Sequence, residues 1–351
     1  MVKKYISVIC ILLIASLIMA GCTPSAPAPA APAAPAAPAA PAAPAQAGDV
    51  EADRSLQIGI TVPNLNIPHW IIMQWTFETL SAEMGHEITF VHAAGYDSVE
   101  RQMNQVQDFI VAGKDAIIIG TVDAEAMVPA VEAAHAAGIP VVEINNLINT
   151  ELSYIKIQSP DFVMGELQAR MMYEALGGVG NVVMINGPGG TTLANRGHGF
   201  RAYVEANFPN IHILGEQFVP PDPVQATNVA EDFLQTFDDI NGIFTWAETP
   251  GIAAASVVAA QGREDDIVVT SMDITSPDMR NAIREQRIFG TVAQQPISIA
   301  TLGFTNAVNA ALGVPSPVNP PEVLFAPITV INHENIETVD LSGMLPPHEV
   351  R

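Results

Sequence analysis

The stretch DFIVAGKDAIIIGTVDAEAMVPAVEAAHAAGIPVV, residues 108 to 142, contains the pattern that decides the fold. Its apolar run at residues 115 to 121 has the length of a strand that is buried on both faces, and helical patterning lies on either side of it. The following helix is expected at residues 124 to 137, because Gly138 and Pro140 close it. The stretch therefore predicts βαβ units, in which helices join parallel strands.

The same alternation continues along most of the chain. Strands are expected at residues 56 to 62, 87 to 93, 115 to 121 and 140 to 144, and in a second series at 154 to 159, 181 to 186, 212 to 218, 242 to 246, 267 to 272 and 291 to 295. Helices are expected near residues 69 to 84, 98 to 112, 124 to 137, 161 to 176, 194 to 207, 224 to 237, 249 to 261 and 276 to 286. One compact sheet does not accommodate so many strands, so we predict two similar α/β lobes with parallel doubly wound sheets.

The first 21 residues have the layout of a secretory signal peptide. Lys3 and Lys4 precede an apolar run that ends at Ala20, and this run is shorter than the roughly 20 residues that a membrane span prefers. Ala20-Gly21-Cys22 resembles the lipobox of bacterial lipoproteins, with Met19 in place of the usual leucine, so Cys22 is expected to carry the lipid. The alternative is an ordinary cleaved signal that leaves a free Cys22. In either case the protein is exported, to the periplasmic or extracellular face of the membrane.

Residues 22 to 54 are expected to form a tether between the lipid and the folded body. Prolines recur every third residue, and such a tract favours extended polyproline II segments over a packed core. About 25 residues at roughly 3.1 Å each reach on the order of 75 Å. The chain's other cysteine, Cys10, lies within the signal, so the mature chain has no internal disulfide and no thiolate metal site.

Charge excludes one broad class of partner. The 351 residues contain 14 Lys plus Arg and 37 Asp plus Glu, a formal net charge of −23. Nucleic acid is therefore not an expected partner, because phosphate binding needs a basic face. An acidic body is also repelled by anionic lipid head groups, which favours holding it away from the membrane.

Polar residues that follow the predicted strands are the candidates for a binding site, because ligands of parallel sheets bind beyond the carboxyl ends of the strands. The set combines carboxylates, carboxamides, a guanidinium, an imidazole and two indoles. This mixture suits a neutral polyhydroxylated ligand, since the polar groups hold hydroxyls and the indole faces cover C–H surfaces. The candidates are Asn66, His69, Trp70, Asn145, Asn146, Asp161, Arg196, Asp222, Trp246, Glu248, Asp273 and Gln294.

Several stretches resemble the periplasmic sugar-binding proteins of the ribose and galactose type, which share a fold with the effector domains of lac-repressor-like regulators. The resemblance covers roughly residues 55 to 315. The matching stretches are LQIGITVPNLNIPHW, residues 108 to 142, NVVMINGPGGTTLANRGHGFRAYV, IVVTSMD and GTVAQQP.

The resemblance implies the type I periplasmic binding fold, with two lobes joined by a three-segment hinge and the ligand in the cleft between them. The N-terminal lobe would comprise residues 55 to 159 plus about 293 to 323, and the C-terminal lobe residues 160 to 292 plus about 324 to 345. It also implies a monomer that closes on a sugar or polyol, delivers it to an ABC transporter permease, and has no cofactor or enzymatic activity.

Site residues carry over by position in this family. His69 and Trp70 stand where relatives commonly have two aromatic residues, and Asn66 lies in the same loop. Arg196 in NRGHGF matches the arginine that relatives use on sugar hydroxyls, and Asp273 in SMD matches the cleft aspartate. Two further positions lie where the chain passes between lobes, namely Asp161 in SPDF and Gln294 in VAQQP.

The hydrogen-bonding pattern departs from that of the relatives. They often have Asp-Arg after the fourth strand, whereas this chain has Asn145-Asn146. They also tend to have Asn-Asp where this chain reads TWAETPG, with Trp246 just before Ala247 and Glu248. The resemblance therefore does not assign ribose or galactose as the ligand of this chain. The ligand could also be a linear polyol or another small polar metabolite.

Several of these residues also have structural interpretations. Arg196 could pair only with Glu205, Asp273 could cap the helix near Ser276, and Trp75 is expected in the core. GPGGTT, residues 187 to 192, lacks the Lys-Ser/Thr ending of a nucleotide-binding loop. His86 and His92 do not have metal-ligand spacing, so no metal site is expected. A signalling receptor, or an enzyme that uses Asp273 and Glu248 as acid and base, are the alternative functions.

Overall fold

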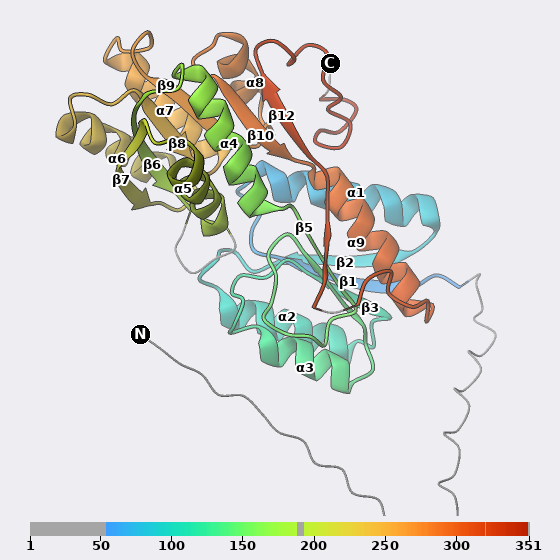
Figure 1. Ribbon diagram of the computed structural model, residues 1–351. Helices are drawn as coiled ribbons and strands as arrows, with labels where there is room; N and C mark the ends of the chain where they lie inside the picture. The colour runs from blue at the N-terminus through green and yellow to red at the C-terminus, as the bar shows by residue number, and fades with distance from the viewer. Residues whose placement is uncertain (1–53, 188–192, 320, 350–351) are drawn as a thin grey trace, which may run out of the picture. The chain divides into compact units, whose positions relative to one another are not determined.

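The computed structural model describes residues 54–187, 193–319 and 321–349 (Figure 1). The predicted signal and nearly all of the tether lie outside the described residues, as do five residues of the GPGGTT loop. The described chain forms two lobes, each with a six-stranded sheet between helices. The predicted two-lobed α/β fold is therefore confirmed. None of the helices in these ranges is both long and apolar enough to cross a bilayer.

The first lobe is built on a fully parallel sheet with the strand order β11-β5-β4-β3-β1-β2. Its strands are β1 (Gln57–Val62), β2 (Glu87–His92), β3 (Ala116–Ile119), β4 (Val141–Ile144), β5 (Ile155–Gln158) and β11 (Val323–Phe325). Helices α1 (Pro68–Met84) and α9 (Pro296–Ala311) cover one face, and α2 (Val99–Val111) and α3 (Val128–Ala136) cover the other. Because helices cover both faces, all four residues of β3 are buried, as its unbroken apolar run predicts.

The second lobe repeats this plan with the strand order β12-β10-β9-β8-β6-β7. Its strands are β6 (Gly180–Asn186), β7 (Ile211–Phe218), β8 (Gly242–Thr245), β9 (Val268–Met272), β10 (Gly290–Gln294) and β12 (Ile328–Asn332). One face is covered by α4 (Asp161–Ala175) and α5 (Ala194–Asn207). The other is covered by α6 (Pro223–Thr236), α7 (Glu248–Ala260) and α8 (Pro277–Arg284). The edge strand β12 runs antiparallel to β10, and this one pairing departs from the all-parallel expectation.

The chain passes between the lobes three times, which matches the three-segment hinge. The passages lie between β5 and α4, between β10 and α9, and between β11 and β12. The strand expected at residues 154 to 159 belongs to the first sheet although it was grouped with the second series. Helix α9 and strands β11 and β12 were not among the expected elements.

Helices α4 and α5 touch backbone to backbone through glycines. A Cβ atom on Gly165 of α4 would overlap the carbonyl oxygen of Arg196 and lie 2.6 Å from the backbone nitrogen of Phe200. A Cβ atom on Gly199 of α5 would likewise overlap the carbonyl oxygen of Phe162. This close contact places Arg196 beside the first residue of α4, Asp161.

We expect Gly165→Ala to lower the free energy of unfolding by about 1–3 kcal/mol, because the added methyl group forces two packed backbones apart. Urea unfolding of the purified protein measures the change. Val163→Ala, at an exposed position of the same helix, is the control and should stay within about 0.5 kcal/mol of wild type. Equal stabilities for the two variants would contradict the close contact.

Candidate functional site

A cavity of about 410 Å³ lies between the two lobes. This volume is within the range of roughly 300–1,000 Å³ that small-molecule sites occupy. The first lobe contributes His69, Trp70, Tyr96 and Asn145 to its wall, and the second contributes Arg196, Trp246, Glu248, Asp273 and Gln294. Apolar residues complete the wall, among them Ile67, Leu193, Pro221 and Ile252.

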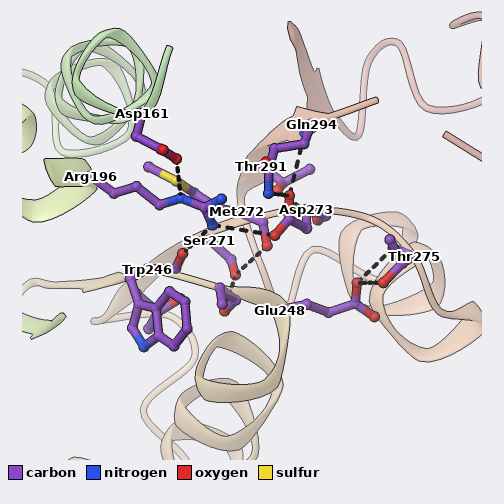
Figure 2. A network of polar contacts seen from close by, with 12 residues as sticks. Asp161, Arg196, Trp246, Glu248, Ser271, Met272, Asp273, Thr275, Thr291 and Gln294 are labelled. Carbon is purple, nitrogen blue, oxygen red and sulfur yellow. Dashed lines mark hydrogen bonds and ion pairs between the residues drawn. The ribbon is translucent and has the colours of Figure 1, made fainter. Parts of the chain in front are cut away.

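Arg196 is the centre of the polar network in the second lobe (Figure 2). Its side chain is 1% exposed. Its Nε donates a hydrogen bond to Asp161 Oδ1 at 2.8 Å. Its Nη1 donates to the Trp246 carbonyl at 2.9 Å and to Asp273 Oδ2 at 3.3 Å. Burial opposes the charged guanidinium, but the carboxylates of Asp273 and Asp161 outweigh it and hold the pKa of Arg196 above its usual range. The arginine is therefore charged and already largely neutralised within the chain.

Asp273 links this network to the hinge. Its Oδ1 accepts hydrogen bonds from the backbone nitrogen of Gln294 at 3.3 Å and from Gln294 Nε2 at 3.1 Å, and Gln294 ends the strand that leads back to the first lobe (Figure 2). Asp273 directly follows β9 and has a φ of 69°, and Asn145 directly follows β4 with a φ of 62°. Left-handed backbone at non-glycine residues is uncommon and clusters at functional sites.

His69 and Trp70 lie in the first turn of α1, which begins after the loop that follows β1. Their rings meet edge to face, with centroids 5.4 Å apart, and Trp70 Nε1 donates to the Tyr96 hydroxyl at 3.3 Å. Burial lowers the pKa of His69 to about 4, with Asp273 raising it and Arg196 lowering it as smaller effects. At neutral pH the imidazole is therefore uncharged, with one nitrogen as a donor and the other as an acceptor.

Three buried polar atoms of the first-lobe wall make no hydrogen bond of normal geometry with the described residues, although the Asn145 side chain lies close enough to His69 to raise its pKa slightly. They are both ring nitrogens of His69 and Oδ1 of Asn145. Buried polar atoms in folded proteins are nearly always paired, so unpaired ones at a cavity wall indicate places where a ligand or water bonds. These atoms could hold the hydroxyls of a small molecule.

The side chains of Glu248 and Trp246 both make hydrogen bonds within the protein in addition to lining the cavity. Glu248, the first residue of α7, accepts hydrogen bonds from Thr275 N at 2.6 Å and Thr275 Oγ1 at 2.9 Å, and burial raises its pKa. Trp246 is 3% exposed, and its Nε1 donates to the Val219 carbonyl at 3.0 Å. Both line the cavity, but each also helps to fix the loops around it.

The structure brings together eight of the twelve candidates as wall residues, and Asp161 lies directly behind Arg196. Asn146 lies outside the wall, and its Nδ2 donates to the Thr121 carbonyl at 3.1 Å. Asn66 and Asp222 require correction. Asn66 is exposed and outside the wall, and its backbone nitrogen donates to the Asn64 side chain. Asp222 is the N-cap of α6, where its Oδ1 accepts from Gln225 N at 2.8 Å. Asn66 therefore belongs to a turn and Asp222 to a helix start in this structure.

Three structural alternatives can also be checked. Arg196 does not pair with Glu205, whose carboxylate instead lies 3.7 Å from Arg201. Ser276, and not Asp273, caps α8. Trp75 is only half-buried, with its ring centroid 6.2 Å from that of His348, so its assignment to the core was wrong.

Tyr96 was missed although the same strand-end rule could have found it. The residue follows β2 in the sequence AAGYDSV, and the candidate set contains no residue from the loop after that strand. Its hydroxyl lies at the cavity wall next to Trp70. No group of three or more His, Cys, Asp or Glu side chains within the described ranges is arranged to hold a metal ion.

Comparison with known protein families decides the classification. Residues 58–314 match the periplasmic binding protein domain. The chain belongs to the periplasmic binding protein family. The resemblance found in the sequence is thereby confirmed, and with it the type I fold.

Relatives of this periplasmic binding protein are themselves named as binding proteins. The D-apiose import binding protein of Paraburkholderia graminis is 31% identical over 257 residues, which cover 72% of this chain and 79% of the relative. The ribose import binding protein of Bacillus subtilis is 28% identical over 250 residues, covering 71% and 79%. A solute-binding protein of Agrobacterium vitis, solved with α-D-tagatopyranose, has a TM-score of 0.75 at 24% identity and covers 83% of this chain and 99% of its own. This last match shows a shared fold.

Proposed function

We propose that this chain is an extracytoplasmic solute-binding lipoprotein that captures a sugar or related polyol in the cavity between its lobes and delivers it to an ABC importer. The observation that carries the proposal is the set of unpartnered atoms on His69 and Asn145, which faces the same cavity as the Arg196–Asp273 pair. Hydroxyl groups both donate and accept hydrogen bonds, so they match a wall that presents both kinds of atom.

The charges of the site favour a neutral ligand. Arg196 is paired with two carboxylates, and His69 is uncharged at neutral pH because its pKa is lowered to about 4. An anionic ligand would meet no free cation and would lie near Asp273 and Glu248. The indole of Trp70 can cover the C–H face of a sugar ring.

The names of the relatives support the same class of ligand. Curated relatives are named as import binding proteins for ribose and D-apiose and as a xylitol-binding protein. The residues that we propose to contact or orient the ligand are His69, Trp70, Tyr96, Asn145, Asp161, Arg196, Trp246, Glu248, Asp273 and Gln294. Attachment of lipid at Cys22 and a monomeric state also belong to this proposal.

A thermal-shift screen with pentoses, hexoses and linear polyols tests the function, because a ligand that binds only the native state raises the melting temperature by mass action. Any hit should be recovered chemically unchanged by mass spectrometry after incubation. A converted sugar would favour the enzyme alternative, in which Asp273 and Glu248 act as acid and base. No shift with any polyhydroxylated compound would contradict the proposal.

We expect Asp273→Asn to weaken binding of the identified sugar by about 1.5–3 kcal/mol, or roughly 10–100-fold in Kd, because a charged acceptor is lost. Asparagine tolerates the left-handed backbone at this position, so the loss reports on the side chain. Isothermal titration calorimetry measures the Kd.

Asp222→Ala is the matched control for this experiment. It removes a carboxylate that caps α6 outside the cavity wall, so it should cost about 1 kcal/mol of stability and leave Kd unchanged. Weaker binding in Asp222→Ala, or unchanged binding in Asp273→Asn, would show that the assignment of the wall is wrong.

A further inference from the structure

Three cationic side chains are buried in the described part of the chain, namely Arg196, Lys156 and Arg280, which are 1%, 7% and 9% exposed. Arg196 is paired with Asp161 and Asp273. Lys156 lies 3.7 Å from a carboxylate oxygen of Glu143. Arg280 has no carboxylate of the described residues within ion-pairing distance, and its Nη1 is buried without a hydrogen-bond partner there. It is thus the exception among the three.

Arg280 lines a second cavity, of about 310 Å³, between α8 and the segment that follows β12. Pro277, Asn281 and Arg284 line it from the helix, and the segment contributes Ile336, Glu337, Val339 and Leu341. None of these residues belongs to the wall of the cavity between the lobes. The two cavities are therefore separate.

The residues that line this second cavity carry two positive charges and one negative charge, in a strongly acidic protein. Glu337 is the one carboxylate in its described wall, and it already accepts from Arg284 Nε at 2.6 Å. Asn281 Oδ1 accepts from Arg284 Nη1 at 3.4 Å, which leaves the amide nitrogen of Asn281 as a further donor. Arg280 has no ion-pair partner among the described residues, and its buried Nη1 has no acceptor there, which is unfavourable for a charged group.

We propose that this cavity binds a small oxyanion, of the phosphate or carboxylate class, on the guanidinium of Arg280. A guanidinium presents a planar fork of N–H donors that matches two oxygens of such an ion. Asn281 and Arg284, one and four positions further along α8, lie on the same wall and add a donor and charge. The cavity has room for the ion together with water.

The bound ion would neutralise Arg280 at the place where α8 faces the segment that follows β12. That segment continues to Gly343, whose carbonyl accepts from Ile297 N at 3.0 Å in the first turn of α9, a helix of the first lobe. An oxyanion on Arg280 would therefore add stability beside a segment that contacts both lobes.

Inorganic phosphate is the probe for the test. Thermal unfolding of the wild-type chain is measured at rising phosphate concentration, with sodium chloride holding the ionic strength constant, and the binding heat is measured by isothermal titration calorimetry. In wild type we expect the melting temperature to rise with the logarithm of phosphate concentration and the binding heat to saturate, and neither effect in Arg280→Gln. Arg287→Gln is the control, because Arg287 pairs with Glu285 outside the cavity, and it should behave as wild type.

Phosphate also stabilises proteins without binding them, through exclusion from the protein surface, but that effect gives no saturable binding heat and should be equal in all three proteins. An equal rise in wild type and Arg280→Gln, or no saturable heat in wild type, would overturn the proposal. Arg280→Met in phosphate-free buffer gives a second test, since removing an uncompensated charge should leave the melting temperature equal or higher. A large fall would show that Arg280 is already satisfied within the chain.

Discussion

Replacing Arg196 by alanine is expected to lower the free energy of unfolding by about 3–5 kcal/mol, even without ligand. The guanidinium is 1% exposed and bonds to two carboxylates and the Trp246 carbonyl. Its removal leaves Asp161 buried at 4% exposure and Asp273 partly buried, both without their cation. Breaking such a pair from one side costs far more than the pair itself contributes. Urea unfolding monitored by circular dichroism measures the loss.

Arg201→Ala is the matched control for Arg196→Ala, because both residues lie on α5 and both pair with carboxylates. Arg201 is about one third exposed, so its pair with Glu216 should contribute only about 0–1 kcal/mol. Arg196→Lys should recover only part of the loss, since an ammonium group cannot reproduce the planar fork. If Arg196→Ala lowers the free energy of unfolding by less than about 1 kcal/mol, water must replace the guanidinium. The network would then be accessible to solvent.

Stability should also depend on pH through His69. Its pKa is lowered from 6.5 to about 4, so between these values the unfolded chain binds a proton that the folded chain does not. The contribution of His69 is therefore fully present above pH 6.5 and is lost as the pH falls towards 4, by a total of about 3 kcal/mol. His69→Phe should remove this dependence and lose at most a weak contact with the Asn145 side chain, because neither ring nitrogen makes a hydrogen bond of normal geometry in the described chain.

The test compares the free energy of unfolding of wild type and His69→Phe at steps from pH 7.5 to 4.5. The difference between the two proteins is the quantity to read, because burial raises the pKa of Glu248 and of Glu143 and gives these groups the opposite pH dependence. His198→Gln, at an exposed position of α5, serves as the control and should keep the wild-type profile. Parallel profiles for wild type and His69→Phe would show that the imidazole is hydrated.

The sequence was sufficient for most of the fold because its signals are local. Buried parallel strands appear as short apolar runs, and helices between them have their own start and stop residues, so eight helices were expected close to their observed positions. The C-terminal elements were harder. Strand β11 has three residues and pairs with β5, whereas β12 pairs with β10 in the other lobe. Such choices between two sheets depend on contacts far apart in the chain.

The site was predictable as a set of positions but not as a set of contacts. The rule that ligands bind beyond strand ends brought out His69, Asn145 and Asp273, which all line the cavity. It also selected Asn66, although the neighbouring Asn64 accepts the hydrogen bond that shapes this turn. Pairing of Arg196 with Asp161 could not be read from the sequence, because it depends on how closely two glycine-containing helices approach.

The hydrogen bonds from Gln294 to Asp273 have a consequence for how ligand preference can change during evolution. Asp273 lies on the cavity wall, and Gln294 is the last residue of the strand that leaves the second lobe. A substitution at Asp273 that suits a new sugar also changes what holds the crossing strand. A substitution at Asp273 that changes ligand preference would therefore also change the hydrogen bonds of Gln294. We expect such a substitution to be accompanied by changes in the residues where the chain crosses between the lobes.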